Sequence, residues 1–277
     1  MMVPSGAQVP RGAADCHMHV FEHAYPWAST ATLFPDEHSL EQYRSVQREL
    51  GIERHVLVQP SSYGTDNRLL LRTLARLGPQ ARGVAVLRPG TEDAEIAELH
   101  RVGVRGLRFN LVQAGATTID MIPRLAGRVA GLGWHIQVHA PAQDLLRGMD
   151  VWGALPCPVV FDHLARVPQP AGVASDLFQA VARLLADGRA WVKLSGFYLD
   201  SQTGAPDYTD SERTVAAFVA ANPARVVWGS DWPHVTERQA PDDRLLFAVL
   251  RRAVPDEGTR ARILVDNPAQ LYGWPAP

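Results

Sequence analysis

The sequence predicts one (β/α)8 barrel, the TIM-barrel fold, as a single domain. The chain has 277 residues, 46% of them hydrophobic, and this length and apolar content suit one barrel. Short apolar runs typical of β-strands alternate with longer runs of helical periodicity, which favours parallel pairing. No glycine-rich phosphate loop follows any strand-like run, which disfavours an open nucleotide-binding sheet.

Eight short runs are predicted as strands because they are apolar and are bounded by glycine, proline or polar residues. Because helical segments separate them, we expect consecutive strands to lie side by side and in parallel. They cover residues 15–21, 55–60, 83–87, 104–110, 134–140, 158–163, 190–196 and 225–231.

Eight longer runs are predicted as helices. In the first, Leu40, Tyr43 and Leu50 form an apolar stripe, and Gly51 follows as a helix stop. Glycine also ends or closely follows several of the others. The predicted helices cover residues 39–50, 67–77, 93–102, 119–132, 142–155, 176–186, 212–221 and 243–254.

Residues 1–14 are predicted as an N-terminal arm because they are rich in proline and glycine, with the barrel at residues 15–277. The arm lacks the apolar segment of a secretion signal, and no apolar run approaches the roughly 18 residues of a membrane span. The two cysteines, Cys16 and Cys157, indicate buried thiols rather than a disulfide framework. We therefore expect a cytoplasmic protein without a membrane partner.

The charge of the chain argues against a nucleic-acid partner. The 27 Lys and Arg residues are balanced by 29 Asp and Glu residues, and the formal net charge is −2. The arginines are scattered among acidic residues, so no basic field is available for a phosphate backbone. A small-molecule substrate is the better expectation.

His17 and His19 are the most informative residues for function. Side chains alternate along a strand, so the two imidazoles are expected on one face, roughly 7 Å apart along the strand. The same alternation places Asp15 on that face. Two imidazoles directed at one point can bind a metal ion or polarise a carbonyl group.

Polar residues at the ends of the predicted strands extend this candidate site. In (β/α)8 barrels the active site lies at the C-terminal ends of the strands. The candidate residues at these ends are His17, His19, Arg108, Asn110, His139, His163, Ser195 and Asp231.

Two kinds of chemistry are open to this set. Zn²⁺ or Mn²⁺ accepts imidazole nitrogen and carboxylate oxygen, so His17, His19, His139 and Asp231 are predicted as metal ligands. Alternatively, the imidazoles stabilise a developing oxyanion without a metal. In both cases Asp231 is positioned to accept a proton from an attacking water molecule.

Seven segments support a family resemblance: residues 15–21, 58–67, 105–110, 161–163, 193–196, 228–234 and 267–273. In this order they resemble the amidohydrolase-2 branch of the amidohydrolase superfamily. Within that branch the chain is similar to the lactonases that open pyrone dicarboxylates and sugar lactones. The resemblance spans about residues 13–274.

The resemblance implies a barrel that hydrolyses a lactone ring, and lactonases of this group require no cofactor. By similarity, Asp231 would activate water while His17, His19 and His163 polarise the carbonyl. Arg108 and Arg166 would bind a substrate carboxylate. Further hydrogen bonds to the substrate would come from Ser61, Tyr63 and Asn110, whereas the resemblance gives His234 no clear role.

The chain departs from the pyrone-lactonase pattern at three positions. His139 stands where those lactonases have tyrosine, and metal-requiring relatives have a histidine ligand on that strand, so one divalent metal ion, Zn or Mn, is also considered. Ala114 and Leu199 stand where arginines bind carboxylates. Because neutral side chains cannot replace a bidentate guanidinium, we expect a lactone with one carboxylate or a neutral sugar lactone.

Two other functions remain open from the sequence. His139 favours a metal-dependent decarboxylase of the same superfamily, whereas the segment 228–234 favours the lactonase. A non-catalytic barrel with a binding or scaffolding role is disfavoured by the complete set of polar strand ends. Barrels of this type often pair, so a homo-oligomer is a further expectation.

Overall fold

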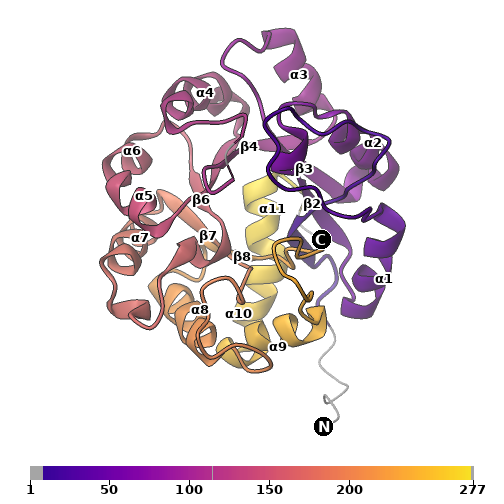
Figure 1. Cartoon of the computed structure of the whole chain (residues 1–277). Helices are drawn as coiled ribbons and strands as arrows, with labels where there is room; N and C mark the ends of the chain where they lie inside the picture. The colour runs from indigo at the N-terminus through magenta and orange to yellow at the C-terminus, as the bar shows by residue number, and fades with distance from the viewer. Residues whose placement is uncertain (1–8, 114, 276–277) are drawn as a thin grey trace.

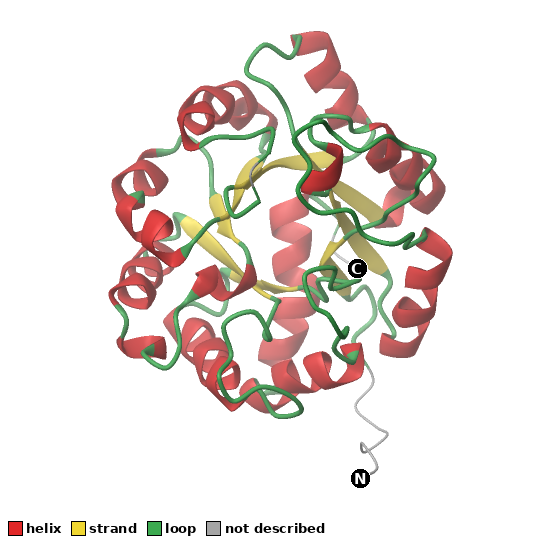
Figure 2. Cartoon of the chain, viewed as in Figure 1, coloured by secondary structure: helices red, strands yellow, loops and turns green. Residues whose placement is uncertain are grey.

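The computed structural model describes residues 9–113 and 115–275. Eight strands form one parallel sheet in chain order, and the first and last strands lie together, which gives a barrel surrounded by helices (Figures 1 and 2). This confirms the predicted fold. The strands are β1 (Ala14–Met18), β2 (Arg54–Val58), β3 (Ala81–Ala85), β4 (Val104–Asn110), β5 (His135–His139), β6 (Val159–Phe161), β7 (Ala190–Leu194) and β8 (Val226–Trp228).

The helices follow the strands on the outside of the barrel. Side chains cap the first turns of some of them, for example Ser39, whose side chain accepts from the backbone N–H of Gln42. They are α1 (Leu40–Leu50), α2 (Arg68–Leu77), α3 (Asp93–Arg101), α4 (Ile122–Val129), α5 (Ala142–Arg147), α6 (Met149–Ala154), α7 (Asp176–Ala186), α8 (Thr209–Ala221), α9 (Asp243–Ala253), α10 (Glu257–Ala261) and α11 (Asn267–Tyr272).

Several predicted boundaries were wrong. The predicted helix 142–155 is two helices, α5 and α6, which meet at Gly148. The predicted strand 15–21 ends at Met18, and its last residue, Phe21, instead forms an isolated antiparallel bridge with His38. The C-terminal helices α10 and α11 were not predicted. The predicted N-terminal arm is largely outside the described residues, although β1 already begins at Ala14.

Helix α11 closes the N-terminal end of the barrel. Leu271 and Tyr272 pack in one apolar cluster with inward-facing residues of the strands, among them Ala14 and Cys16 of β1. Figure 1 shows α11 behind the ring of strands when the barrel is viewed along its axis. The opposite end of the barrel is therefore the end that is open to a ligand.

No helix among the described residues combines the length and the apolar character that crossing a membrane requires.

Strands β1 and β8 approach each other closely at Gly229. A Cβ atom at this position would lie 2.7 Å from the Cβ atom of His17 and 2.9 Å from its backbone nitrogen. Only glycine therefore allows the end of β8 to pack against His17. The close approach brings the two strands that carry His17 and Asp231 together.

We expect Gly229→Ala to lower the free energy of unfolding by about 1–3 kcal/mol, because the added methyl group overpacks the contact with His17. Urea denaturation measures the change. The control is Gly127→Ala in α4, where an added Cβ atom meets nothing within 4 Å. This control should stabilise the protein by about 0.5–1 kcal/mol, and a Gly229→Ala protein of unchanged stability would contradict the packing argument.

Candidate active site

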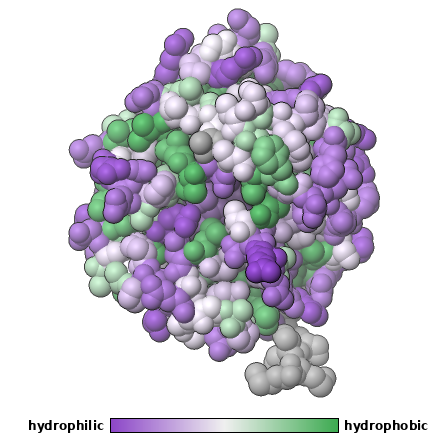
Figure 3. Space-filling view, viewed as in Figure 1, coloured by the Kyte–Doolittle hydropathy of each residue, from purple (hydrophilic) through white to green (hydrophobic). Residues whose placement is uncertain are grey.

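A cavity of about 240 Å³ lies at the C-terminal ends of the strands. Figure 3 looks onto this face of the barrel, where polar and apolar residues are mixed. The polar part of the lining contains His19, Ser61, Arg108, Asn110, His139, His163, Arg166, Tyr198, Asp231 and His234, and the apolar part contains Phe21, Leu33, Pro60, Val112, Leu199 and Val235. Most of the residues predicted for the site are therefore brought together.

His17 and His19 lie two residues apart and are directed toward the same point, as side-chain alternation predicts. A bulge in β1 shifts its register against β2 between Asp15 and Met18, which breaks the alternation between Asp15 and the two histidines. The Nε2 atoms of His17 and His19 lie 3.2 Å apart. The predicted pairing of the two imidazoles is confirmed.

The same bulge turns Asp15 away from the imidazoles, so its predicted place on their face was wrong. The Asp15 carboxylate instead accepts hydrogen bonds from the hydroxyls of Tyr43 and Ser230, at 3.0 and 2.6 Å. It also accepts from the backbone N–H groups of His17 and Ser230. Asp15 thus joins β1 to the segment after β8.

The hydrogen bonds of His19 decide which of its ring nitrogens carries the proton. Its Nδ1 atom lies 2.8 Å from the carbonyl oxygen of Val58. Because a carbonyl oxygen only accepts, Nδ1 carries the proton and Nε2 presents a lone pair. Burial lowers the pKa of His19 to about 3, so the ring is neutral. A neutral His19 can accept a proton or bind a metal ion at Nε2, but it cannot donate there.

His17 lies beneath the cavity and does not line it, although it was predicted to contact substrate. Its side chain is fully buried, and burial followed by the nearby Lys193 charge lowers its pKa well below the ordinary value. With His19 Nε2 as acceptor, His17 Nε2–H is the donor of the 3.2 Å contact. His17 Nδ1 then accepts from the Lys193 ammonium group at 3.3 Å.

Asp231 lies at the junction of three imidazoles. Its Oδ1 atom is 3.6 Å from His17 Nε2 and 3.8 Å from His19 Nε2, and its Oδ2 atom is 3.7 Å from His163 Nδ1. Burial raises the pKa of this carboxyl to about 6, although the charge of His234 and the Tyr198 hydroxyl oppose the rise. A carboxylate with such a pKa is suited to accept a proton near neutral pH.

A hydrogen-bond chain supports Asp231 from the side of α9. The Tyr198 hydroxyl donates to Asp231 Oδ2 at 2.7 Å, so the 3.2 Å contact between His234 Nδ1 and the Tyr198 oxygen must use the imidazole proton. His234 Nε2 lies 3.0 Å from Asp243 Oδ1. When both carboxylates are ionised, the chain is satisfied only if His234 carries protons on both nitrogens. This gives His234 a structural hydrogen-bonding role.

A left-handed turn after β6, at His163–Arg166, places the side chains of His163 and Arg166 in the cavity lining. All four residues of this turn have φ between 50° and 54°, a conformation that residues other than glycine rarely adopt. His163 Nδ1 lies 3.0 Å from the Ser195 hydroxyl. Burial lowers the pKa of His163 well below the ordinary value, so this imidazole is also neutral.

Arg108 and Asn110 reach the cavity from the end of β4. Arg108 donates to the carbonyl oxygen of Gln59 at 3.1 Å, and the Asn110 amide donates to the Ser61 hydroxyl at 2.8 Å. Tyr63 does not line the cavity. Its hydroxyl instead bonds to the backbone N–H and carbonyl oxygen of Glu22, because the turn after β2 directs it toward the loop that follows β1.

His139 lies apart from the other predicted metal ligands. Its Nε2 atom accepts a hydrogen bond from Arg166 at 3.0 Å, and burial lowers its pKa to about 3. A guanidinium group on this nitrogen occupies the lone pair that a metal ion would need. Within the described residues, His139 belongs to neither group of side chains that could hold an ion.

The donor set of His17, His19 and Asp231 fits a divalent metal ion. The three donor atoms lie 3.2, 3.6 and 3.8 Å from one another. A tetrahedral Zn²⁺ with bonds of about 2.0–2.1 Å separates its ligand atoms by roughly 3.3 Å. Asp162 Oδ1, 3.3 Å from His17 Nδ1, could then accept the proton that His17 holds on that nitrogen.

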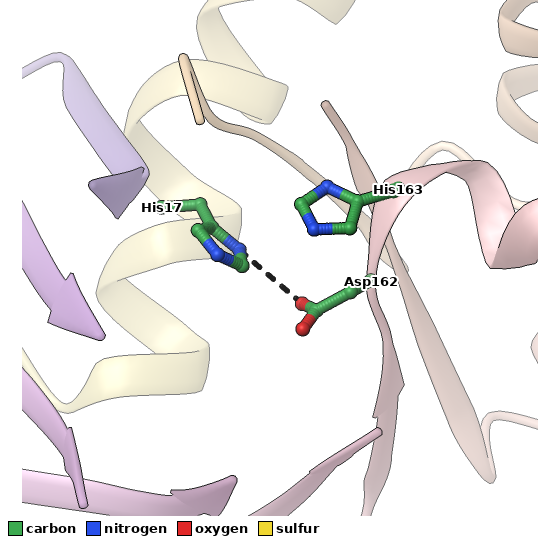
Figure 4. Close-up of side chains that lie close together, drawn as sticks. All are labelled: His17, Asp162 and His163. Atoms are coloured by element: carbon green, nitrogen blue, oxygen red, sulfur yellow. Dashed lines mark ion pairs between the residues drawn. The ribbon is translucent and has the colours of Figure 1, made fainter. Parts of the chain in front are cut away.

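Figure 4 shows a second possible metal group, His17, Asp162 and His163. An ion pair between Asp162 and Lys193 explains this group better. Lys193 Nζ lies 3.7 Å from Asp162 Oδ1 and donates to the Gln137 side chain at 2.7 Å. Although burial opposes ionisation, the charges of Lys193 and Arg108 lower the pKa of Asp162. The Lys193 ammonium group already supplies the positive charge that a metal would bring.

The sequence did not identify Asp162, Lys193 or Tyr198 as parts of the site. Asp162 precedes His163, and strand alternation would place the two on opposite faces, but β6 ends at Phe161. Lys193 lies on β7 and contacts His17 from the interior of the barrel. The adjacent pair Asp162 and His163 was the one available signal.

Residues 14–274 match the amidohydrolase family. The chain belongs to the amidohydrolase family. It is 36% identical over 97% of its length to a 2-pyrone-4,6-dicarboxylate hydrolase of Comamonas testosteroni, covering 92% of that protein. It is 34% identical over 98% of its length to a 4-sulfomuconolactone hydrolase of Rhizobium radiobacter, covering 93% of that protein.

Solved structures agree with this assignment. A crystal structure from Agrobacterium tumefaciens superposes with a TM-score of 0.91 and 28% identity, covering 98% of this amidohydrolase and 96% of the other chain. The resemblance to the amidohydrolase-2 branch is confirmed, and the assignment of a hydrolase follows from it. The roles of the individual site residues stay predictions.

We expect Tyr198→Phe to raise the pKa of Asp231 above about 6, because the lost hydroxyl hydrogen bond stabilises the ionised carboxylate. Carboxyl-carbon NMR of aspartate-labelled protein measures the midpoint. The signal is assigned by its disappearance in Asp231→Asn. A midpoint that is unchanged or lower in Tyr198→Phe would contradict the role of this hydrogen bond.

Proposed function

We propose that this amidohydrolase hydrolyses the ring ester of a small lactone. The observation that carries the proposal is Asp231, a carboxylate with a pKa of about 6, beside neutral imidazoles at a cavity of about 240 Å³. The two curated relatives described above are lactone hydrolases by name. Their similarity over nearly the whole chain supports the same reaction class.

The residues can carry this reaction in two steps. Asp231 accepts a proton from a water molecule, whose oxygen then attacks the lactone carbonyl carbon. The ester bond to the ring oxygen breaks, and that oxygen leaves as a hydroxyl with the proton from Asp231. The product is a hydroxy acid that ionises near neutral pH, so each turnover releases one proton.

Positively charged and polar side chains at the cavity would hold the substrate. Arg108 is a buried cation in the lining, where it can stabilise a developing oxyanion or bind one carboxylate. Asn110 and Ser61 supply neutral hydrogen-bonding groups at the same wall. His163 contacts the Asp231 carboxylate at the same cavity.

A divalent metal ion would be held by His17, His19 and Asp231. When bound, it would polarise the lactone carbonyl as a Lewis acid. His19 supports this arrangement, because its Val58 hydrogen bond leaves the Nε2 lone pair directed at the other donors. Lys193 Nζ and Asp162 Oδ1 both lie 3.3 Å from His17 Nδ1 and hold that ring in place.

The substrate is proposed to be a lactone with one carboxylate or a neutral sugar lactone. Leu199 lines the cavity as an apolar residue, whereas Ala114, the other position that lacks an arginine, lies outside the described residues. The decarboxylase alternative depended on His139 as a metal ligand. Since His139 accepts from Arg166, we do not propose it. A cytoplasmic location and a homo-oligomer stay predictions.

The reaction is tested with a panel of neutral and carboxylated lactones in weakly buffered solution with a pH indicator. Lactone hydrolysis releases one proton per molecule of substrate, whereas a decarboxylase releases carbon dioxide. No acid release from any lactone, or carbon dioxide as the product, would contradict the proposal.

We expect kcat/KM of the chelator-treated, metal-free protein to fall about tenfold per pH unit below pH 6, because Asp231 must be ionised to accept a proton and its pKa is about 6. Above pH 6, kcat/KM should become independent of pH. Asp231→Asn should lower kcat by about 10²–10⁴-fold while circular dichroism stays unchanged. Near-normal turnover in this variant would remove Asp231 from its role as the base.

We expect the protein to bind one Zn²⁺ per chain, and His19→Gln to weaken this binding at least about tenfold because it removes a ligand. His139→Gln is the matched control and should change the affinity little, since His139 lies outside the donor set. Calorimetric titration of the chelator-treated protein measures both. Equal losses in the two variants would place His139 among the ligands.

A further inference from the structure

Arg166 lines the cavity, but its charge is already opposed by a carboxylate. Its Nε atom donates to Asp200 Oδ2 at 2.6 Å, and a terminal nitrogen donates to Asp200 Oδ1 at 3.0 Å. This is a bidentate pair, the strongest arrangement of an arginine with a carboxylate. Asp200 belongs to the loop after β7 and is not part of the cavity lining, so it contacts Arg166 from behind.

The hydrogen bonds that Arg166 already makes leave few of its N–H donors free to bind a substrate. A guanidinium group has five N–H donors. Two of them bind Asp200 and one binds His139 Nε2. The remaining two can donate to an uncharged oxygen without any rearrangement. A substrate carboxylate at the same place would face Asp200, a like charge, across a single guanidinium group.

The rest of the lining does not compensate for this loss of positive charge. Arg108 and Arg166 are the only Lys or Arg side chains in the described part of the lining. Arg108 itself has Asp162 at 3.9 Å from its Nε atom. The histidines of the lining next to Arg166, His139 and His163, are neutral because burial lowers their pKa values. His234, the lining histidine that carries protons on both nitrogens, is opposed by the Asp243 carboxylate, 3.0 Å from its Nε2 atom. The cavity is therefore poorly matched to a substrate with two carboxylates.

We infer that Asp200 determines the substrate class by neutralising Arg166, so that the Arg166 end of the cavity binds a hydroxyl or carbonyl oxygen instead of a second carboxylate. The inference rests on the proposed lactonase function and gives a structural cause, Asp200, for the limit to lactones with at most one carboxylate. Arg166 is then a donor to a neutral group, and Asp200 is a specificity-determining residue.

The test compares Asp200→Asn with the matched control Asp207→Asn. The asparagine keeps an oxygen that can accept from Arg166 but removes the opposing charge. Asp207 is an exposed carboxylate in the same loop region. The probes are two unreactive rings of similar size, isophthalate with two carboxylates and 3-hydroxybenzoate with one carboxylate and one hydroxyl. Calorimetry measures the affinity of each probe for each protein.

We expect the wild-type protein and Asp207→Asn to favour 3-hydroxybenzoate. In Asp200→Asn, the ratio of isophthalate affinity to 3-hydroxybenzoate affinity should rise about tenfold. A merely structural role of Asp200 would weaken both probes equally and leave the ratio unchanged, which contradicts the inference. A fall in the ratio, or no binding of isophthalate to Asp200→Asn, also overturns it, because Asp200 would then position Arg166 for a carboxylate.

Binding and turnover separate this inference from the proposed function. Neither probe contains an ester, so their affinities do not depend on hydrolysis. A protein that hydrolyses no lactone but shows the tenfold change contradicts the proposed function alone. Lactone hydrolysis with an unchanged ratio contradicts only the role of Asp200.

Discussion

The junction between β1 and the segment after β8 is the constraint on which the site depends. Asp231 donates its backbone N–H to the carbonyl oxygen of His17 at 2.8 Å, and His19 donates to the carbonyl oxygen of Trp232 at 2.9 Å. These two hydrogen bonds close the barrel, and they also hold Asp231 beside the imidazoles. The buried Asp15 carboxylate strengthens the same junction through Ser230. The contacts that close the barrel are therefore the same contacts that position the site residues.

The pKa values of the site residues follow from their burial close to one another at this junction. Burial makes the charged form of every imidazole costly, so the rings at the junction are neutral, and Lys193 and Arg108 disfavour protonation further. Asp162 balances those two cations from below. Asp231 has weaker compensation, and burial therefore raises its pKa to about 6. Asp162 and Asp231 therefore differ in pKa. Asp162 stays ionised and structural, whereas Asp231 can exchange a proton near neutral pH.

The sequence predicted the parts of the site that follow directly after the ends of strands. The barrel rule and the apolar runs were enough to bring His19, His163 and Asp231 to one end of the fold. The prediction failed where the backbone leaves the regular pattern. The bulge in β1 reverses the face of Asp15, and alternation along a strand cannot reveal a bulge. Tyr198 reaches Asp231 from a loop, and a contact of this kind has no local signal in the sequence.

The left-handed turn at His163–Arg166 shows why function and local stability are opposed in this fold. Four consecutive residues that have Cβ atoms adopt positive φ, which costs roughly 1–2 kcal/mol per residue. The contacts that help to offset this cost include two of the site itself, from His163 to Ser195 and from Arg166 to Asp200, together with the burial of Leu164 and Ala165. A relaxed right-handed turn would direct both site side chains elsewhere. The strained turn is therefore tied to the loop after β7 by the same contacts that position the site residues.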